Sequence, residues 1–134
     1  MTPFHLKIVT PDGLIFDGQA EELIVRTSRG DVGILARHMD YVAALGMGRA
    51  VIVSGGQRRT AACIGGMVSV CKGEVTLVPT TFEWAEDIDK ARAEAAYQKA
   101  EKVLNDQNAS NTDLRLAEAK LHRALVRKSV ASGL

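Results

Sequence analysis

The chain has 134 residues, of which 46% are hydrophobic and 25% charged, a balance typical of one globular domain with a small appendage. Its formal net charge of +1 gives no basic field of the kind that attracts nucleic acid. No apolar run approaches the roughly 18 residues that span a bilayer, and no charged-then-apolar leader opens the sequence, so we expect membrane contact only through a partner.

Short strands are expected throughout residues 1–84. A Pro-Asp-Gly turn closes the first strand, because proline fixes φ and the glycine tolerates positive φ. Residues 54–56 and 72–74 have the composition of hairpin turns. The predicted strands cover residues 4–9, 14–18, 22–27, 50–53, 57–64, 67–71 and 75–78. Strands of this length and spacing predict a flattened antiparallel β-sandwich.

Segment 28–38 places two glycines around one carboxylate and ends in a histidine. Gly30 and Gly33 suit a tight turn or bulge that directs Asp31 outward at the end of a sheet. Two interpretations remain open from the residues alone. In one, Asp31 is an exposed turn acid and His38 is satisfied by a backbone carbonyl; in the other, both contact a partner.

Two cysteines, Cys63 and Cys71, flank a predicted break at Gly65-Gly66. They are either neighbours across a hairpin or, as we favour, two small core residues. The three histidines are scattered through the chain, whereas structural zinc sites usually need four ligands at short spacings. We therefore predict neither a metal site nor a disulfide framework.

Residues 85–134 change to a helical pattern. Acidic residues crowd positions 86–89, where they suit the N-terminal end of a helix dipole. The polar segment 105–111 separates two helices, and Ser110 with Asp113 is placed to cap the second. The apolar faces are expected at Ala93, Ala96, Ala100, Val103 and Leu104, and at Leu114, Ala117, Leu121 and Leu125. This helical spacing on both sides of a polar segment predicts an antiparallel two-helix hairpin, so the predicted fold class is α+β.

No catalytic constellation is present. The sequence has no phosphate-binding G-x-x-x-x-G-K-[ST] loop and no nucleophile elbow. No histidines are placed at metal-ligand spacing. We therefore expect a protein that is not an enzyme and has no catalytic residues.

Three motifs in order resemble those of the ATP synthase epsilon subunit family. Segment 28–38 is similar to the family's G-E-x-G-I-L/Y-P-x-H signature, with Ala36 where the family usually has proline. Segment 64–70 is similar to S-G-G-x-x-E-V, and segment 85–89 to A-E-D-I/L-D. The resemblance covers most of the chain and implies a non-catalytic rotor subunit of a proton- or sodium-translocating ATP synthase.

The resemblance also implies the partners. The sandwich, residues 1–84, would contact the gamma subunit and the ring of c subunits. Asp31 would meet the polar loops of the c ring, and His38 would lie near gamma. The contact residues carried over are Gly30, Asp31, Val32, Gly33, Ile34, Leu35 and His38. The implied location is the cytoplasmic face of the cell membrane, held peripherally through the c ring, with no nucleic-acid partner.

Segment 88–93 matches the family's I/L-D-x-x-R-A motif, which binds ATP in some bacterial members. ATP is therefore expected as a regulatory ligand of residues 85–134, with no obligatory cofactor. In ATP-binding members the position of Lys99 is often arginine, which implies a weaker phosphate contact here. The implied ATP-binding residues are Glu83, Ile88, Asp89, Arg92, Ala93, Lys99, Arg123 and Arg127.

The residues support part of this site independently. If the hairpin turns near Asn108, Arg92 lies beside Arg123, and Asp89 lies opposite Arg127. Arg123 and Arg127 share one side of the second helix. Converging cations repel one another unless an anion lies between them, and arginine is a good phosphate ligand. The alternative is that Asp89 forms only surface ion pairs, each worth roughly 0–1 kcal/mol.

The second helix is basic, with five cations from Leu114 onward against the single acid Glu118. Such a face is either simply solvated or complementary to an acidic partner. In the family the extended helices reach an acidic segment of the catalytic subunits of the alpha/beta ring and block rotation. The rival interpretation of the whole chain is a stand-alone nucleotide-sensing module without a rotary partner, which would not need segment 30–38.

Overall fold

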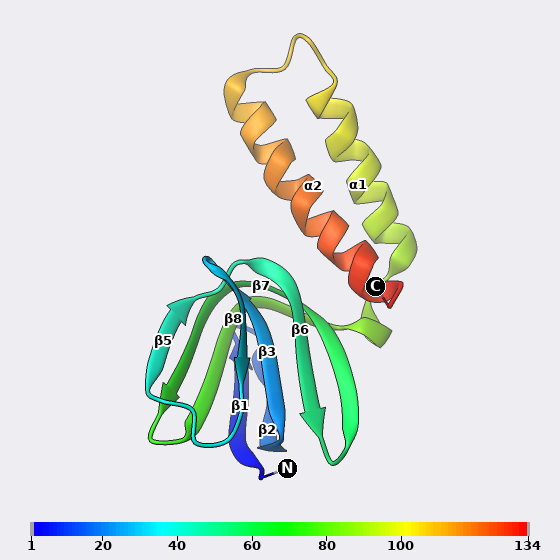
Figure 1. Ribbon diagram of the computed structural model, residues 1–134. Coiled ribbons are helices and arrows are strands. Elements are labelled where there is room, and N and C mark those ends of the chain that lie inside the picture. Colours follow the sequence, from blue (N-terminus) through cyan, green and yellow to red (C-terminus); the bar gives the residue numbers. More distant parts are fainter. Residues whose placement is uncertain (1, 134) are drawn as a thin grey trace. The chain divides into compact units, whose positions relative to one another are not determined.

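The computed structural model describes residues 2–133. The chain divides into two compact units, one ending at Trp84 and the other beginning at Ala85. The first unit contains only strands and the second only helices (Figure 1). The strands are β1 (Phe4–Thr10), β2 (Gly13–Ala20), β3 (Glu22–Thr27), β4 (Gly30–Ile34), β5 (Tyr41–Ala44), β6 (Met47–Ser54), β7 (Gln57–Cys71) and β8 (Glu74–Trp84). The helices are η1 (Ala85–Asp87), α1 (Lys90–Leu104) and α2 (Asn111–Ala131).

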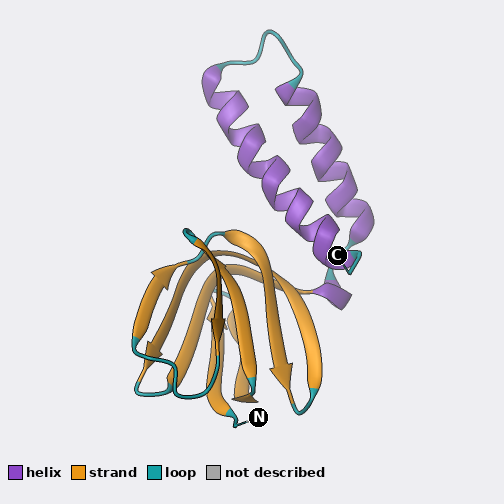
Figure 2. Cartoon of the chain, in the orientation of Figure 1, coloured by secondary structure: helices purple, strands orange, loops and turns teal. Residues whose placement is uncertain are grey.

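The eight strands form one strongly curved sheet whose two halves face each other as a sandwich (Figure 2). Its order is β2-β1-β8-β7-β6-β3-β4, and β5 pairs with β7. The prediction of a β-sandwich followed by a helical hairpin is confirmed. The sheet is not wholly antiparallel, however, because β1 pairs in parallel with β8. This pair joins the first and last strands of the unit. Such a long-range contact cannot be predicted from local turn motifs.

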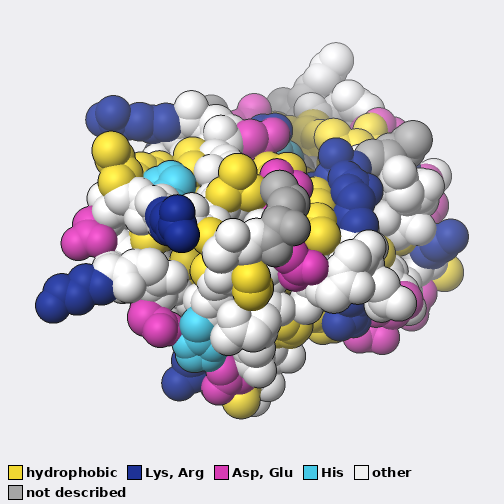
Figure 3. Space-filling model, turned by 60° about the horizontal axis from the view of Figure 1, so that its bottom comes forward, with side chains coloured by type: hydrophobic (Ala, Val, Ile, Leu, Met, Phe, Trp, Pro, Cys, Tyr) yellow, Lys and Arg dark blue, Asp and Glu magenta, His cyan; other side chains and the backbone are white. Residues whose placement is uncertain are grey.

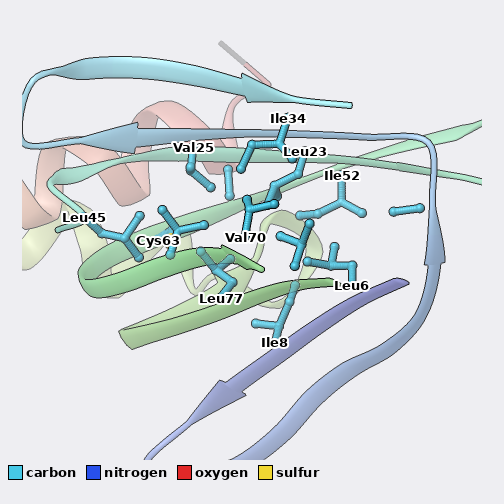
Figure 4. Packing of buried hydrophobic residues seen from close by; sticks show 14 of the residues in the cluster. Leu6, Ile8, Leu23, Val25, Ile34, Leu45, Ile52, Cys63, Val70 and Leu77 are labelled. Atoms are coloured by element: carbon cyan, nitrogen blue, oxygen red, sulfur yellow. The ribbon is translucent and has the colours of Figure 1, made fainter. Parts of the chain in front are cut away.

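Alternating side chains from both halves of the sheet make the core. In β1, Phe4, Leu6, Ile8 and Thr10 are buried while the residues between them are more exposed, as a strand with one covered face requires. Figure 4 shows the large side chains pointing toward one another from β1, β3, β6, β7 and β8. Burying each Leu or Ile contributes roughly 1.5–3 kcal/mol to folding. The cluster lies entirely within the first unit.

Strand β7 runs through Gly65-Gly66 without a break, contrary to the prediction. Both glycines have positive φ, 70° and 95°, yet pairing with β8 continues on either side, from Ile64–Thr81 to Gly66–Pro79. At Gly66 a Cβ would lie 2.0 Å from the carbonyl oxygen of Val78. Glycine is therefore required here because the backbones of β7 and β8 approach closely, and not because the chain turns.

The cysteines differ in environment, so the prediction of two core residues is only half correct. Cys63 is buried in the core, and this burial raises the pKa of its thiol to about 12. Cys71 is the exposed last residue of β7. Both thiols are free. Among residues 2–133, no group of three or more His, Cys, Asp or Glu side chains has an arrangement suited to a metal ion.

The helical unit is a hairpin in which α1 and α2 lie side by side (Figure 1). Asp89 caps α1 by accepting a hydrogen bond from the backbone N–H of Arg92 at 3.0 Å, and Ser110 caps α2 in the same way, as predicted. Small buried residues line the contact between the helices: Ala93, Ala100, Ala117 and Ala124. Leu125, predicted on the inner face, is instead 49% exposed, because Ala124 takes the inward position. No helix in residues 2–133 combines the length and hydropathy needed to cross a membrane.

Three charged residues connect β1, β2 and β8 at the surface. The His5 ring contacts Asp17 through Nε2 and Glu74 through Nδ1, each at 2.5 Å. Hydrogen bonds to these two carboxylates raise the pKa of His5 above its ordinary value. Lys7 pairs directly opposite Asp17 in the strand register.

We expect the sandwich to lose stability, through His5, as pH rises above about 6.5. The raised pKa means that protonated His5 stabilises the fold fully below the unfolded-state value near 6.5, and this contribution is lost as pH rises through the folded-state pKa. Urea unfolding between pH 6 and pH 9 measures the effect. In His5→Asn this part of the pH slope should vanish; an unchanged slope in the variant would contradict the assignment.

Candidate functional site

A pocket of about 530 Å³ lies within the helical unit, between α1 and α2 and extending to the loop that joins them. We call it the hairpin pocket. We call its alanine, valine and leucine side chains the apolar floor, and the charged side chains that line it from both helices the rim. The lining residues are Ala96, Lys99, Ala100, Val103, Asp106, Asn108, Ala109, Asp113, Leu116, Ala117, Lys120, Arg123 and Arg127.

Three of the predicted ATP-binding residues line the hairpin pocket. Lys99 comes from α1, and Arg123 and Arg127, one turn apart, come from α2. The two arginines are half-buried and Lys99 is exposed. Small residues bring the helices together closely enough for cations from both to share one opening. This convergence follows the antiparallel pairing that the sequence predicted.

The other predicted ATP-binding residues do not line this pocket. Asp89 and Arg92 lie in the cap and first turn of α1, both exposed, with the Asp89 carboxylate occupied by the backbone of Arg92. Ile88 and Ala93 are buried. Glu83 belongs to β8, in the other unit. The motif therefore begins α1, while the cavity lies toward the loop.

The residues at the loop end of the pocket were not among those predicted from the sequence. Lys120 adds a fourth cation, and Asp106, Asn108 and Asp113 add polar oxygens there. Asp106 accepts a hydrogen bond from the backbone of Asn108 at 2.9 Å. The sequence shows that Lys120 lies one helical turn before Arg123. On a helix with several basic residues, however, that spacing does not indicate which of them line a pocket. Cations around an apolar floor suit an organic polyanion, because arginine and lysine bind phosphate and the floor accepts an apolar group.

Contacts between α1 and α2 also join the two helices near the end of the hairpin away from the loop. The Nζ of Lys128 lies 2.6 Å from Glu94 and 4.1 Å from the centre of the Tyr97 ring. A hydrogen bond from Lys128 lowers the pKa of the Glu94 carboxyl. These contacts connect the end of α2 to the start of α1, so they stabilise the closed hairpin.

Segment 30–34 is a strand, β4, and not the predicted turn or bulge. The turn is at Ser28-Arg29; Gly30 has φ of 119°, but Gly33 has no positive φ. Asp31 lies directly opposite Arg26 on β3 and receives its Nε–H at 2.5 Å. This hydrogen bond holds the pKa of Asp31 below its ordinary value. Asp31 is thus exposed but already paired.

The predicted partner-binding residues are divided between strand β4 and the loop that follows it. β4 has five residues, about 16 Å, with Asp31 near its start and His38 beyond its other end. Ile34 is fully buried in the core, and Val32 packs against that core. Their side chains support the fold, so the residues open to a partner are Asp31, Leu35 and His38 with the two glycines.

The loop between β4 and β5 presents apolar side chains to solvent. Leu35 is 44% exposed and Met39 76%. The His38 ring contacts the backbone oxygen of Met39 at 2.7 Å and the edge of Tyr41. Asp40 accepts the backbone N–H of Lys72 and so holds the loop to the β7–β8 turn. Figure 3, with the lower end of Figure 1 brought forward, shows apolar side chains at the surface among charged ones.

Comparison with protein families gives two matches that together span nearly the whole chain. Residues 3–85 match the ATP synthase delta/epsilon chain beta-sandwich domain, and residues 86–132 match the long alpha-helix domain of the same chain. ATP synthase epsilon chains are among the similar curated proteins. That of Ruminococcus albus is 42% identical over 133 residues, with 98% of each chain covered, and that of Bacillus subtilis is 44% identical over 131 residues, with the same coverage.

Solved structures show the same fold. A chain in the Euglena gracilis mitochondrial ATP synthase, in a structure of the OSCP, F1 and c-ring parts, superposes with a TM-score of 0.85 at 21% identity, covering 96% of this chain and 81% of that one. A chain in the Tetrahymena thermophila mitochondrial central stalk and c ring gives 0.63 at 10% identity, with 95% of each chain covered.

Proposed function

The chain belongs to the ATP synthase delta/epsilon chain family, and from this premise we propose that it is the epsilon subunit that links the central stalk to the c ring and restrains ATP hydrolysis. The observation that carries the proposal is the match of both family domains, in order, over residues 3–132. We propose no catalytic role of its own for the chain and a peripheral location, with membrane contact through the c ring alone.

In this proposal the sandwich makes the stalk contacts. Leu35 and His38 at the loop end would border gamma, and Asp31, held in place by Arg26, would face polar loops of the c ring. An acid already oriented by a strand neighbour loses little conformational freedom on binding. Asp31 lies on a strand of the sheet, and Leu35 and His38 lie in the loop that follows it, so the sandwich would carry all three contacts.

The helical unit would supply the regulation. ATP in the hairpin pocket would stabilise the closed hairpin, and the hairpin would open and extend toward the alpha/beta catalytic subunits when ATP is scarce. A ligand shifts such an equilibrium only by its difference in affinity for the two states. Lys99, Arg123 and Arg127 line one pocket in the closed hairpin. They would separate if the two helices parted, and this would provide the difference in affinity. The basic face of α2 would then meet an acidic surface.

The second candidate is a stand-alone nucleotide sensor. The hairpin pocket alone would serve it, but the exposed Leu35 and Met39 would then have no partner. The two candidates differ in whether the sandwich binds a stalk subunit.

We expect the tagged full chain, expressed together with the gamma and c subunits of its own organism, to co-elute with gamma in size-exclusion chromatography. Leu35→Glu should weaken this complex at least about tenfold, because a charge would be buried at the contact. Leu14→Glu is the matched control, since Leu14 is 60% exposed on β2 of the same unit. A chain that elutes alone would favour the stand-alone sensor.

A further inference from the structure

Lys120 lies on the rim of the hairpin pocket together with Lys99 and Arg123. It stands one turn before Arg123 on α2, on the same side of that helix. Across the pocket, Lys99 lies on α1 beside Ala100, and Ala100 and Ala117 are both buried in the contact between the helices. The pocket thus has cations on both walls at the level where the helices approach closely.

The charges of the pocket are not balanced by its own acids. Four cationic and two acidic side chains line it. Of the acids, Asp106 is engaged by the backbone of the loop. Within residues 2–133, no hydrogen bond or ion pair joins Lys99, Lys120 or Arg123 to a carboxylate. Like charges held together destabilise a helix pair unless a counter-ion lies between them.

We infer that Lys120 is an anion-binding residue of the hairpin pocket and, with Lys99 and Arg123, holds the phosphate chain of the nucleotide. This inference rests on the proposed function and adds to it a residue outside the motif that indicated ATP. Lysine carries a compact charge on a flexible side chain. Lys99 and Lys120, on opposite walls, can therefore contact successive phosphate groups from both sides, whereas a single planar guanidinium would contact them from one side.

The number of cations also bears on which anions bind. A triphosphate carries more negative charge than a monophosphate and reaches more of the rim. Lys120 therefore contributes more to the binding of a triphosphate than to that of AMP. The same reasoning applies to inorganic tripolyphosphate, which has no base and tests the cationic rim alone.

Calorimetric titration of the full chain with ATP, AMP and tripolyphosphate tests the inference. We expect Lys120→Gln to raise the Kd for ATP and tripolyphosphate about three- to tenfold and that for AMP by less than about twofold. Arg115→Gln is the matched control: it removes one positive charge from an exposed position on the same helix that does not line the pocket. Far-UV circular dichroism establishes that both variants keep the hairpin.

The outcomes separate the inference from the proposed ATP sensing. If the wild type binds ATP and Lys120→Gln weakens it no more than Arg115→Gln, the role of Lys120 is overturned and ATP sensing stands. If the wild type binds tripolyphosphate through Lys120 but shows no preference for ATP over it, the cationic rim is supported and nucleotide recognition is not. If neither polyanion binds, both the role of Lys120 and the proposed ATP sensing are overturned.

Discussion

Gly66→Ala should destabilise the sandwich by about 4 kcal/mol or more, which lowers its melting temperature by roughly 15–30 °C. Two costs add. A Cβ at this position would meet the carbonyl oxygen of Val78 at 2.0 Å and the Cα of Pro79 at 2.7 Å. Both obstacles are backbone, so β8 itself must move. In addition, φ of 95° is strained for a residue with a side chain.

The matched control is Gly73→Ala. Gly73 also has positive φ, 81°, but nothing lies within 4 Å of its would-be Cβ. This change should cost only the conformational strain, about 1–2 kcal/mol. Thermal melts followed by circular dichroism compare the two. Equal losses would mean that backbone conformation alone matters and that the close approach of β7 to β8 is not what requires glycine.

The double variant Arg123→Ala/Arg127→Ala should lose the stabilisation that ATP gives the wild type. At a hundredfold excess over Kd, a ligand that binds only the folded form adds about 2.7 kcal/mol. Each charge-assisted hydrogen bond is worth roughly 1.5–3 kcal/mol, so removing two arginines that line the hairpin pocket should raise Kd more than a hundredfold. Thermal unfolding with and without millimolar ATP measures the loss.

A control with the same loss of charge is Lys102→Ala/Arg115→Ala, whose side chains are exposed and do not line the hairpin pocket. It should keep the full ATP-dependent shift. The unfolding of the sandwich, whose core cluster is separate from the hairpin, should be unchanged in both variants. If the control loses the ATP-dependent stabilisation equally, ATP binding depends on the overall positive charge of the helices and not on side chains that line the hairpin pocket.

The class of fold was predictable because its signals are local. Strand alternation, the Pro-Asp-Gly turn and the Lys72-Gly73 turn depend on neighbouring residues, and the structure has strands and turns at these positions. The Ser110 cap depends on one side chain reaching the N–H three residues later. The family motifs likewise gave the identity from short stretches of sequence.

Features that depend on residues far apart in the chain could not be predicted from the sequence. Segment 30–34 has glycines that suggest a turn, but pairing with β3 makes it a strand, and only that register places Asp31 opposite Arg26. Leu125 fits a helical stripe, yet the close packing of two alanine-rich helices brings Ala124 inward instead. Gly65-Gly66 resembles a break, but β8 requires a close approach there.

The sequence by itself determined the strands other than β4 and β5, the hairpin, the family and the cations of α2, because each follows from the pattern along one segment. The tertiary structure alone decided the parallel β1–β8 pair, the position of the hairpin pocket and its members. The physical reason is that a cavity is what remains between two packed surfaces. Its walls depend on which small residues meet, Ala100 and Ala117 here, and for this reason Lys120 lines the hairpin pocket while Arg92 does not.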